Sequence, residues 1–218
     1  LDDSRWQFIV SGLRNTIIIT FFAVLLGVFL GFLIAIVRST HDKTGKLKIL
    51  NVICRVYLTV IRGTPTMIQL MITYYIIFAS VNVSKIFVAV CAFGINSGAY
   101  VAEIVRSGIM SIDQGQFEAG RSLGLNYTQT MTKIILPQAV KNILPALGNE
   151  MIVLLKETSI SGYIGLTDLT RGGDIIRSQT YSALFPLLAV AAIYLVIVCF
   201  LTYLVGRLER RLRNNERK

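Results

Sequence analysis

The sequence predicts an all-α polytopic membrane protein with about five transmembrane helices, organised as a single domain over residues 1–218. Of its 218 residues, 54% are hydrophobic and only 16% are charged, whereas soluble domains average about 25% charged residues. A hydrocarbon core of about 30 Å requires roughly 20 apolar residues per helix. Five stretches meet or approach this length, at about residues 16–37, 65–81, 86–105, 143–165 and 183–206.

The distribution of charge predicts how these spans are oriented. The formal net charge is +10, and the basic residues gather in the segments 38–48, 106–141 and 207–218. Lys and Arg collect in cytoplasmic loops, so we expect all three segments on the cytoplasmic side of the cell membrane. With five spans, the N-terminus then lies outside and the C-terminus inside. Since the membrane accounts for the charge, no nucleic acid partner is predicted.

The residues before the first span show a pattern typical of a membrane interface, and the span itself shows a pattern typical of close helix packing. Residues 4–15 mix apolar and basic side chains and include Trp6, so we expect an amphipathic segment that lies at the outer interface. Within the span, Gly27 and Gly31 have the spacing that lets two helices approach closely. This contact could be made with another subunit or within the same subunit.

The second span is predicted to follow a break. A charged residue at mid-membrane costs several kcal/mol on insertion scales, so we place Arg62 near the cytoplasmic surface. Residues 47–61 would then form an interfacial or shallow helix. The span itself would begin at Pro65, because proline suits the first position of a helix.

A polar face is predicted on the third span. Asn96, Tyr100 and Glu103 occur at i, i+4 and i+7, which places them on one side of a helix. An acid and an amide avoid lipid, so this face is expected to point to protein or to a water-filled cavity. The alternative for Glu103 is an ion pair with Arg106, three residues on.

The fourth span is the least regular. We expect Pro145 to open it, and Glu150 to lie on the same face as Glu157, seven residues later. A break follows at residues 158–162. Polar interruptions of this kind are tolerated where the backbone lines protein or a cavity. The alternative is a self-neutralised pair of Lys156 and Glu157 that closes the helix end.

Several kinds of chemistry are absent from the sequence. There is no G-x-x-x-x-G-K-[ST] phosphate loop, so ATP cannot be bound and split by that route. A single histidine, His41, excludes every two-His metal motif, and no G-x-S-x-G elbow is present. No metal, no catalytic residue and no bound cofactor are therefore predicted.

The polar segment 107–142 separates the third and fourth spans, and part of it carries a family signature. It contains Glu118, Ala119, Gly124 and then Ile134-x-Leu136-Pro137. This pattern resembles the EAA loop of permease subunits from binding-protein-dependent ABC importers. The second Ala of that motif is replaced by Gly120, a change that we expect not to matter for the fold.

Other motifs resemble the branch of that family that carries polar amino acids, such as histidine, arginine and glutamine. They are RGTP at 62–65, NSGAYVAEIVRSGI at 96–109 and LKETS at 155–159. The resemblance implies a type I ABC importer permease fold with a cytoplasmic coupling helix. It also implies two ATP-binding subunits that bind ATP and Mg, a second permease subunit (a copy or a paralogue) and an extracytoplasmic binding protein. The residues expected to contact the ATPase are Phe117, Glu118, Ala119, Gly120, Arg121, Leu123, Gly124 and Leu125.

The acids of the predicted interior lead to a substrate hypothesis. A buried carboxylate is costly unless a cation meets it, so we predict that a basic amino acid (arginine, lysine or histidine) crosses beside Glu103. Neutral or acidic cargo such as glutamine is the alternative, and an ion-coupled carrier or a non-transporting assembly subunit are rivals from other classes. The predicted substrate-binding residues are Glu103, Asn96, Tyr100, Glu150, Gln69 and Thr158.

Overall fold

The computed structural model describes residues 4–214, and all regular structure in this range is helical. The elements, in chain order, are α1 (Arg5–Thr44), α2 (Lys48–Gly63), α3 (Thr66–Ile72), the π-helical η1 (Thr73–Ile77), α4 (Lys85–Met110), α5 (Gln114–Ser122), α6 (Tyr127–Thr130), the π-helical η2 (Met131–Ile135), α7 (Leu136–Glu157), the 3₁₀-helical η3 (Thr158–Ile164), α8 (Leu169–Thr180) and α9 (Leu184–Asn214).

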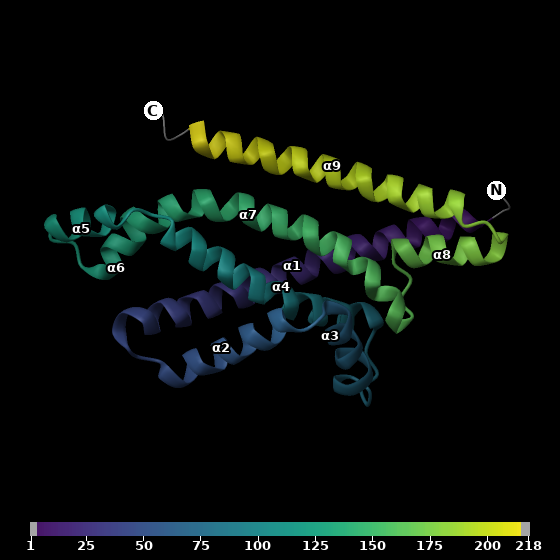
Figure 1. Ribbon diagram of the computed structural model, residues 1–218, viewed down its shortest axis with the longest axis horizontal. Coiled ribbons are helices and arrows are strands. Elements are labelled where there is room, and N and C mark those ends of the chain that lie inside the picture. Colours follow the sequence, from purple (N-terminus) through teal and green to yellow (C-terminus); the bar gives the residue numbers. More distant parts are fainter. Residues whose placement is uncertain (1–3, 215–218) are drawn as a thin grey trace.

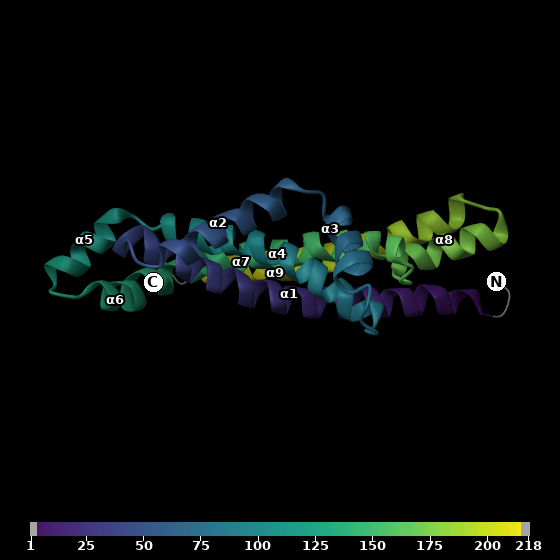
Figure 2. The same cartoon turned by 90° about the horizontal axis from the view of Figure 1, so that it is seen from below.

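Four long helices, α1, α4, α7 and α9, run along the long axis of the molecule (Figures 1 and 2). Among the described residues, three stretches are long and apolar enough to cross a membrane: Arg5–Asp42, Lys85–Met110 and Leu184–Leu212. Phe93 of α4 is fully buried in the largest described core cluster, together with Ile19, Leu70 and Leu154. The prediction of an all-helical membrane protein is confirmed.

Glycines allow α1 and α4 to pack closely within one subunit. A Cβ atom on Gly27 would lie 2.9 Å from Ser97 Cβ, and one on Gly31 would lie 2.4 Å from Val101 Cγ1. Real Cβ atoms essentially never approach so closely. Of the two interpretations of the glycine pair, the structure supports packing within the subunit.

The prediction that the residues before the first span form a segment lying at the outer interface is wrong. Residues 5–15 continue without a break into α1, a helix of 40 residues that is about 60 Å long at 1.5 Å per residue. This segment packs on α8, where a Cβ on Gly12 would lie 2.4 Å from Asp168 O and one on Gly172 would lie 2.4 Å from Phe8 O. Direct backbone contact with α8 holds the segment in place, so it does not lie alone on a surface.

Residues 47–61, predicted as an interfacial or shallow helix, form part of α2 and pack on neighbouring long helices. Helix α2 lies beside α1 and α4, and Leu58 packs against Ala99 and Ala102 near the middle of α4. Helices α3 and η1 together span 12 residues, or about 18 Å, which is too short to cross a bilayer alone. Helix α2 and α3–η1 therefore form one composite element, in which Arg62 Nη1 lies 3.8 Å from Glu103 Oε1.

Helix α7 begins earlier than predicted. It starts at Leu136 with Pro137 in its first turn, and Pro145 lies inside the helix rather than opening it. Proline at the first turn is favourable because the missing N–H would be unpaired there anyway. The predicted break after Glu157 is confirmed, since the chain changes there to the 3₁₀ helix η3.

The described parts of the three basic segments lie toward one end of the molecule. Figure 1 shows that the α1–α2 turn, helices α5 and α6, and the C-terminal end of α9 lie toward the same end. Helix α8 and the beginning of α1 lie at the opposite end. This arrangement places α5 and α6 at the end of the molecule opposite α8.

Candidate functional site

The break between α2 and α3 is closed by Gln69. Its side-chain amide donates hydrogen bonds to Ile61 O at 2.7 Å, Thr64 O at 3.0 Å and Thr64 Oγ1 at 2.8 Å. These bonds satisfy carbonyls that the end of α2 leaves without helical partners. Gln69 Oε1 in turn accepts a bond from Asn96 Nδ2 at 2.9 Å. Two predicted site residues, Gln69 and Asn96, thus join α3 to α4.

The interior next to this link presents hydrogen-bond acceptors. Glu150 of α7 accepts a bond of 2.9 Å from Ser97 Oγ, and among the described residues no Lys or Arg forms an ion pair with it. The Oδ1 atom of Asn96 is buried and has no hydrogen-bond partner within the described chain. A carboxylate and an amide oxygen that lack cationic or N–H partners favour a ligand that brings donors.

Glu103 has a different environment. Its Oε1 atom lies 3.0 Å from Arg38 Nη1 and 3.8 Å from Arg62 Nη1. The guanidinium of Arg62 also lies 5.8 Å from the centre of the Tyr100 ring, within the range of cation–π contacts. Arg106 pairs with Asp42 at 4.0 Å. The alternative interpretation, an ion pair of Glu103 with Arg106, is therefore not found: Glu103 pairs with Arg38 and Arg106 with Asp42.

The sixth predicted residue, Thr158, lies apart from these groups. It is fully buried, and its hydroxyl donates to Leu155 O at 2.7 Å. Ser161, also fully buried, has a hydroxyl without a partner in the described structure. The unwound segment that the sequence predicts here is therefore packed rather than open.

Charged residues on α8 mark the opposite end of the molecule. Asp168 caps α8 through bonds from the amides of Thr170 and Arg171, and burial raises the pKa of its carboxyl against the effect of these bonds. Asp174 is partly exposed, and a hydrogen bond from Arg177 is the main cause that lowers its pKa. These groups cap and stabilise α8.

Sequence reasoning missed Ser97 and Arg38 as functional neighbours. Ser97 follows Asn96 and is turned about 100° from the polar face used for the prediction, although its polar side chain in a glycine-rich helix was a usable signal. Arg38 was assigned to a cytoplasmic loop on charge alone. No sequence pattern links it to Glu103, which lies 65 residues away.

The segment after α4 forms a compact helical turn. Asp113 caps α5 by accepting from the amide of Gly115 at 2.6 Å. After α5, Gly124 adopts a φ of 74°, a left-handed conformation that glycine tolerates best. Asn126 and Gln129 then form a capping box with two bonds of 2.9 Å. These signals fix the angle between α5 and α6.

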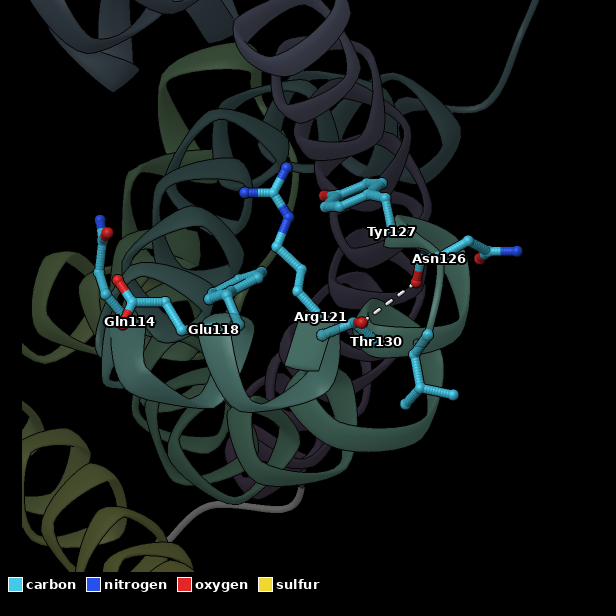
Figure 3. A pocket seen from close by; sticks show the side chains of 8 residues that line it. Gln114, Glu118, Arg121, Asn126, Tyr127 and Thr130 are labelled. Carbon is cyan, nitrogen blue, oxygen red and sulfur yellow. Dashed lines mark hydrogen bonds between the residues drawn. The ribbon is translucent and has the colours of Figure 1, made fainter. Parts of the chain in front are cut away.

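A hollow of about 670 Å³ lies between α5 and α6. Figure 3 shows Gln114, Glu118 and Arg121 of α5 on one side and Tyr127 and Thr130 of α6 on the other. Phe117 and Leu125, two of the predicted coupling residues, also line it. Leu123 is 76% exposed at the end of α5. An open, mixed polar and apolar surface of this kind can receive a side chain or helix end of another protein.

The structure shows how glycine is accommodated at position 120 in place of the motif's second alanine. Gly120 is buried, and a Cβ atom there would lie 2.6 Å from Thr130 Cγ2 and 2.7 Å from Thr130 Oγ1. The side chain of Thr130 occupies the space that an alanine would need. Threonine at position 130 therefore requires glycine at position 120.

We expect Gly120→Ala to loosen the packing of α5 on α6, because overpacking typically costs about 1–3 kcal/mol. Hydrogen exchange of the amides in residues 114–130 measures this as lost protection. The double variant with Thr130→Ala removes both clashing atoms and is expected to restore protection. Equal protection in Gly120→Ala and the parent protein would contradict the packing argument.

Residues 23–214 match a protein family described as "Binding-protein-dependent transport system inner membrane component". The chain belongs to this family. It is thus an inner-membrane permease subunit of a transporter and not an enzyme, since the ATPase is a separate subunit in such systems.

Relatives of the permease match over nearly its full length. The putative glutamine transport system permease protein GlnP of Rickettsia typhi is 39% identical over 94% of this chain and 93% of its own. The arginine transport system permease protein ArtQ of Bacillus subtilis is 38% identical over 96% of this chain and 94% of its own. The glutamine transport system permease protein GlnP of Escherichia coli K12 is 36% identical over 94% of this chain and 93% of its own.

Solved structures agree with the fold of the permease. A crystal structure of an amino acid ABC transporter with histidines matches with a TM-score of 0.86 and 44% identity, over 94% of each chain. An inward-facing MetNI methionine ABC transporter matches with a TM-score of 0.81 over 97% of this chain and 99% of that chain. At 19% identity, the second match shows a shared fold alone.

Proposed function

We propose that the permease carries basic amino acids in an ABC importer for amino acids, with Glu150 as the carboxylate that meets the cationic group of the cargo. The single observation that supports this proposal most is the environment of Glu150, whose only described hydrogen-bond donor is Ser97. A carboxylate in the interior stabilises an ammonium or guanidinium group through charge-assisted hydrogen bonds.

The neighbouring groups support the same choice. The unpaired Oδ1 atom of Asn96 offers a further acceptor on α4, one residue before Ser97. Glu103 already has Arg38 and Arg62 close to its Oε1 atom, so its charge is compensated without cargo. Of the predicted acids, Glu150 is therefore the better candidate for a cation, and Glu103 has a structural partner.

The family and the geometry support a proposal for the assembly. We infer two copies of an ATP-binding subunit, which hold ATP and Mg, docked on α5 and α6 through residues 117–125. A second permease subunit, either a copy or a paralogue, and an extracytoplasmic binding protein complete the complex. The position of the described parts of the three basic segments toward one end supports a cytoplasmic position for α5, α6 and the C-terminus, with the N-terminus outside.

The proposal is tested by uptake of labelled arginine into proteoliposomes that contain the complete complex. Glu150→Gln keeps the shape of the side chain and the bond from Ser97 but removes the charge. Because a hydrogen bond to a charged group contributes about 1.5–3 kcal/mol, arginine uptake at low concentration is expected to fall by about tenfold or more.

Two comparisons make this experiment decisive. Glu103→Gln is expected to reduce arginine uptake less than Glu150→Gln, since Glu103 is neutralised by Arg38. ATP hydrolysis without cargo reports whether each variant still assembles. Unchanged arginine uptake in an assembled Glu150→Gln complex would refute the proposal.

A neutral cargo is the second candidate, because relatives in Rickettsia typhi and Escherichia coli are named as glutamine permeases. Glutamine also carries an α-ammonium group that Glu150 could accept. The two candidates differ in uptake and competition. If the cargo is basic, labelled arginine is expected to be taken up and excess glutamine not to reduce its uptake; if the cargo is neutral, labelled glutamine is expected to be taken up and excess arginine not to reduce its uptake.

A further inference from the structure

A second polar hollow lies outside the acceptors of α4 and α7. It has a volume of about 450 Å³ and is lined by Arg38 of α1, Arg55 and Arg62 of α2, and Glu103 of α4. Arg55 and Arg62 are seven residues apart and therefore share one face of α2. We call the hollow formed by these four residues the arginine basin.

The charges of the arginine basin do not balance. Three guanidinium groups and one carboxylate line it, which gives a net charge of +2. Glu103 is engaged by Arg38 at 3.0 Å and has Arg62 at 3.8 Å, whereas Arg55 forms no ion pair with any residue in the described range. The Nε–H group of Arg38 is buried and has no acceptor there. The basin thus lacks an anion.

An exposed apolar residue adjoins the basin. Val52 of α2 is 58% exposed and lies three residues before Arg55, on the adjoining part of the helix surface. A lipid with its headgroup in the basin has this apolar contact beside it, whereas a small soluble anion uses only the basin.

The position of the basin fits a lipid headgroup region. Arg55 lies seven residues from the start of α2 at Lys48, or about 10 Å along the helix axis. The α1–α2 turn lies at the same end of the molecule as α5 and α6 (Figure 2). Basic pockets between helices on the cytoplasmic side of a membrane are suited to anionic headgroups. We propose that the arginine basin binds the phosphate of an anionic phospholipid.

Native mass spectrometry of the delipidated complex, with phosphatidylglycerol or phosphatidylcholine added back, tests this proposal without any transport assay. The parent complex is expected to retain phosphatidylglycerol in preference to phosphatidylcholine. Arg55→Gln removes one charge without breaking the Glu103 pairs. Since each basic residue near an anionic surface contributes about 1 kcal/mol, retention is expected to fall by about fivefold.

Lys48→Gln is the matched control, because it removes a cation from the same helix outside the basin and is expected to leave retention unchanged. Equal retention by Arg55→Gln and the parent complex would overturn the proposal, as would an equal loss in Lys48→Gln or equal retention of phosphatidylcholine. Complete displacement of phosphatidylglycerol by inorganic phosphate would assign the basin to a soluble anion and would also overturn it.

Discussion

Gly124→Arg is expected to abolish co-purification of the permease with its ATP-binding subunit. Gly124 lies in the turn between α5 and α6, with a φ of 74° and open space around its Cβ position. An arginine there projects from the surface that we assign to the ATPase, and it also disfavours the left-handed backbone by roughly 1 kcal/mol. Pull-down through a tag on the permease, with quantification of the bound ATPase, measures the effect.

The chain supplies a close control in Gly45. This residue has a φ of 64° and open space around its Cβ position, and it lies in the α1–α2 turn at the same end of the molecule. Gly45→Arg therefore adds the same side chain and the same backbone strain outside α5 and α6. Retention of the ATPase by Gly45→Arg and its loss from Gly124→Arg would identify docking as the cause. Equal retention by both would show that this turn does not contact the ATPase.

Gly31→Leu is expected to prevent the permease from accumulating in the membrane as a folded protein. A Cβ atom at this position would lie 2.4 Å from Val101 Cγ1 and 2.9 Å from the backbone nitrogen of Ala102. A leucine adds three further carbons to that contact, so α1 and α4 must separate along the contact that holds them together. Fluorescence-detected size-exclusion chromatography of solubilised membranes is expected to show loss of the monodisperse peak.

Gly206→Leu is the matched control, because it makes the same change from glycine to leucine in a long helix without close packing against another helix. Gly206 lies in α9, and no atom lies within 4 Å of its Cβ position. The same substitution there is expected to preserve the peak. A monodisperse Gly31→Leu protein would contradict the close packing of α1 on α4.

Much of the fold follows from the sequence because apolar length and glycine spacing are local signals. The long helices α1, α4 and α9 are predicted from long apolar runs, and the break after Glu157 from a run of small polar residues. The packing of α2 was not predictable in the same way. Its arginines indicate the membrane surface, but no local pattern shows that Arg62 lies beside Glu103 and the ring of Tyr100, both far away in the sequence.

The contacts within the polar interior could not be predicted from the sequence either. The spacing of Asn96, Tyr100 and Glu103 identified a face of α4, but the partners that divide this face come from other helices. Gln69 engages Asn96, Arg38 engages Glu103, and Ser97, which belongs to a different face, engages Glu150. Which carboxylate keeps its charge for cargo depends on these long-range contacts, and single-sequence reasoning cannot supply them.

The continuity of α1 has a mechanical consequence. The helix contacts α8 through Gly12 at one end and carries Arg38 at the other, 26 residues away, or about 39 Å along its axis. The path through α2 and α3, by contrast, contains a joint at Thr64–Pro65 that is secured by the side chain of Gln69. A displacement of α8 would therefore reach Arg38 through one unbroken helix, whereas the path through α2 and α3 passes this joint. We expect relative movement of the two paths to be taken up at the joint that Gln69 closes.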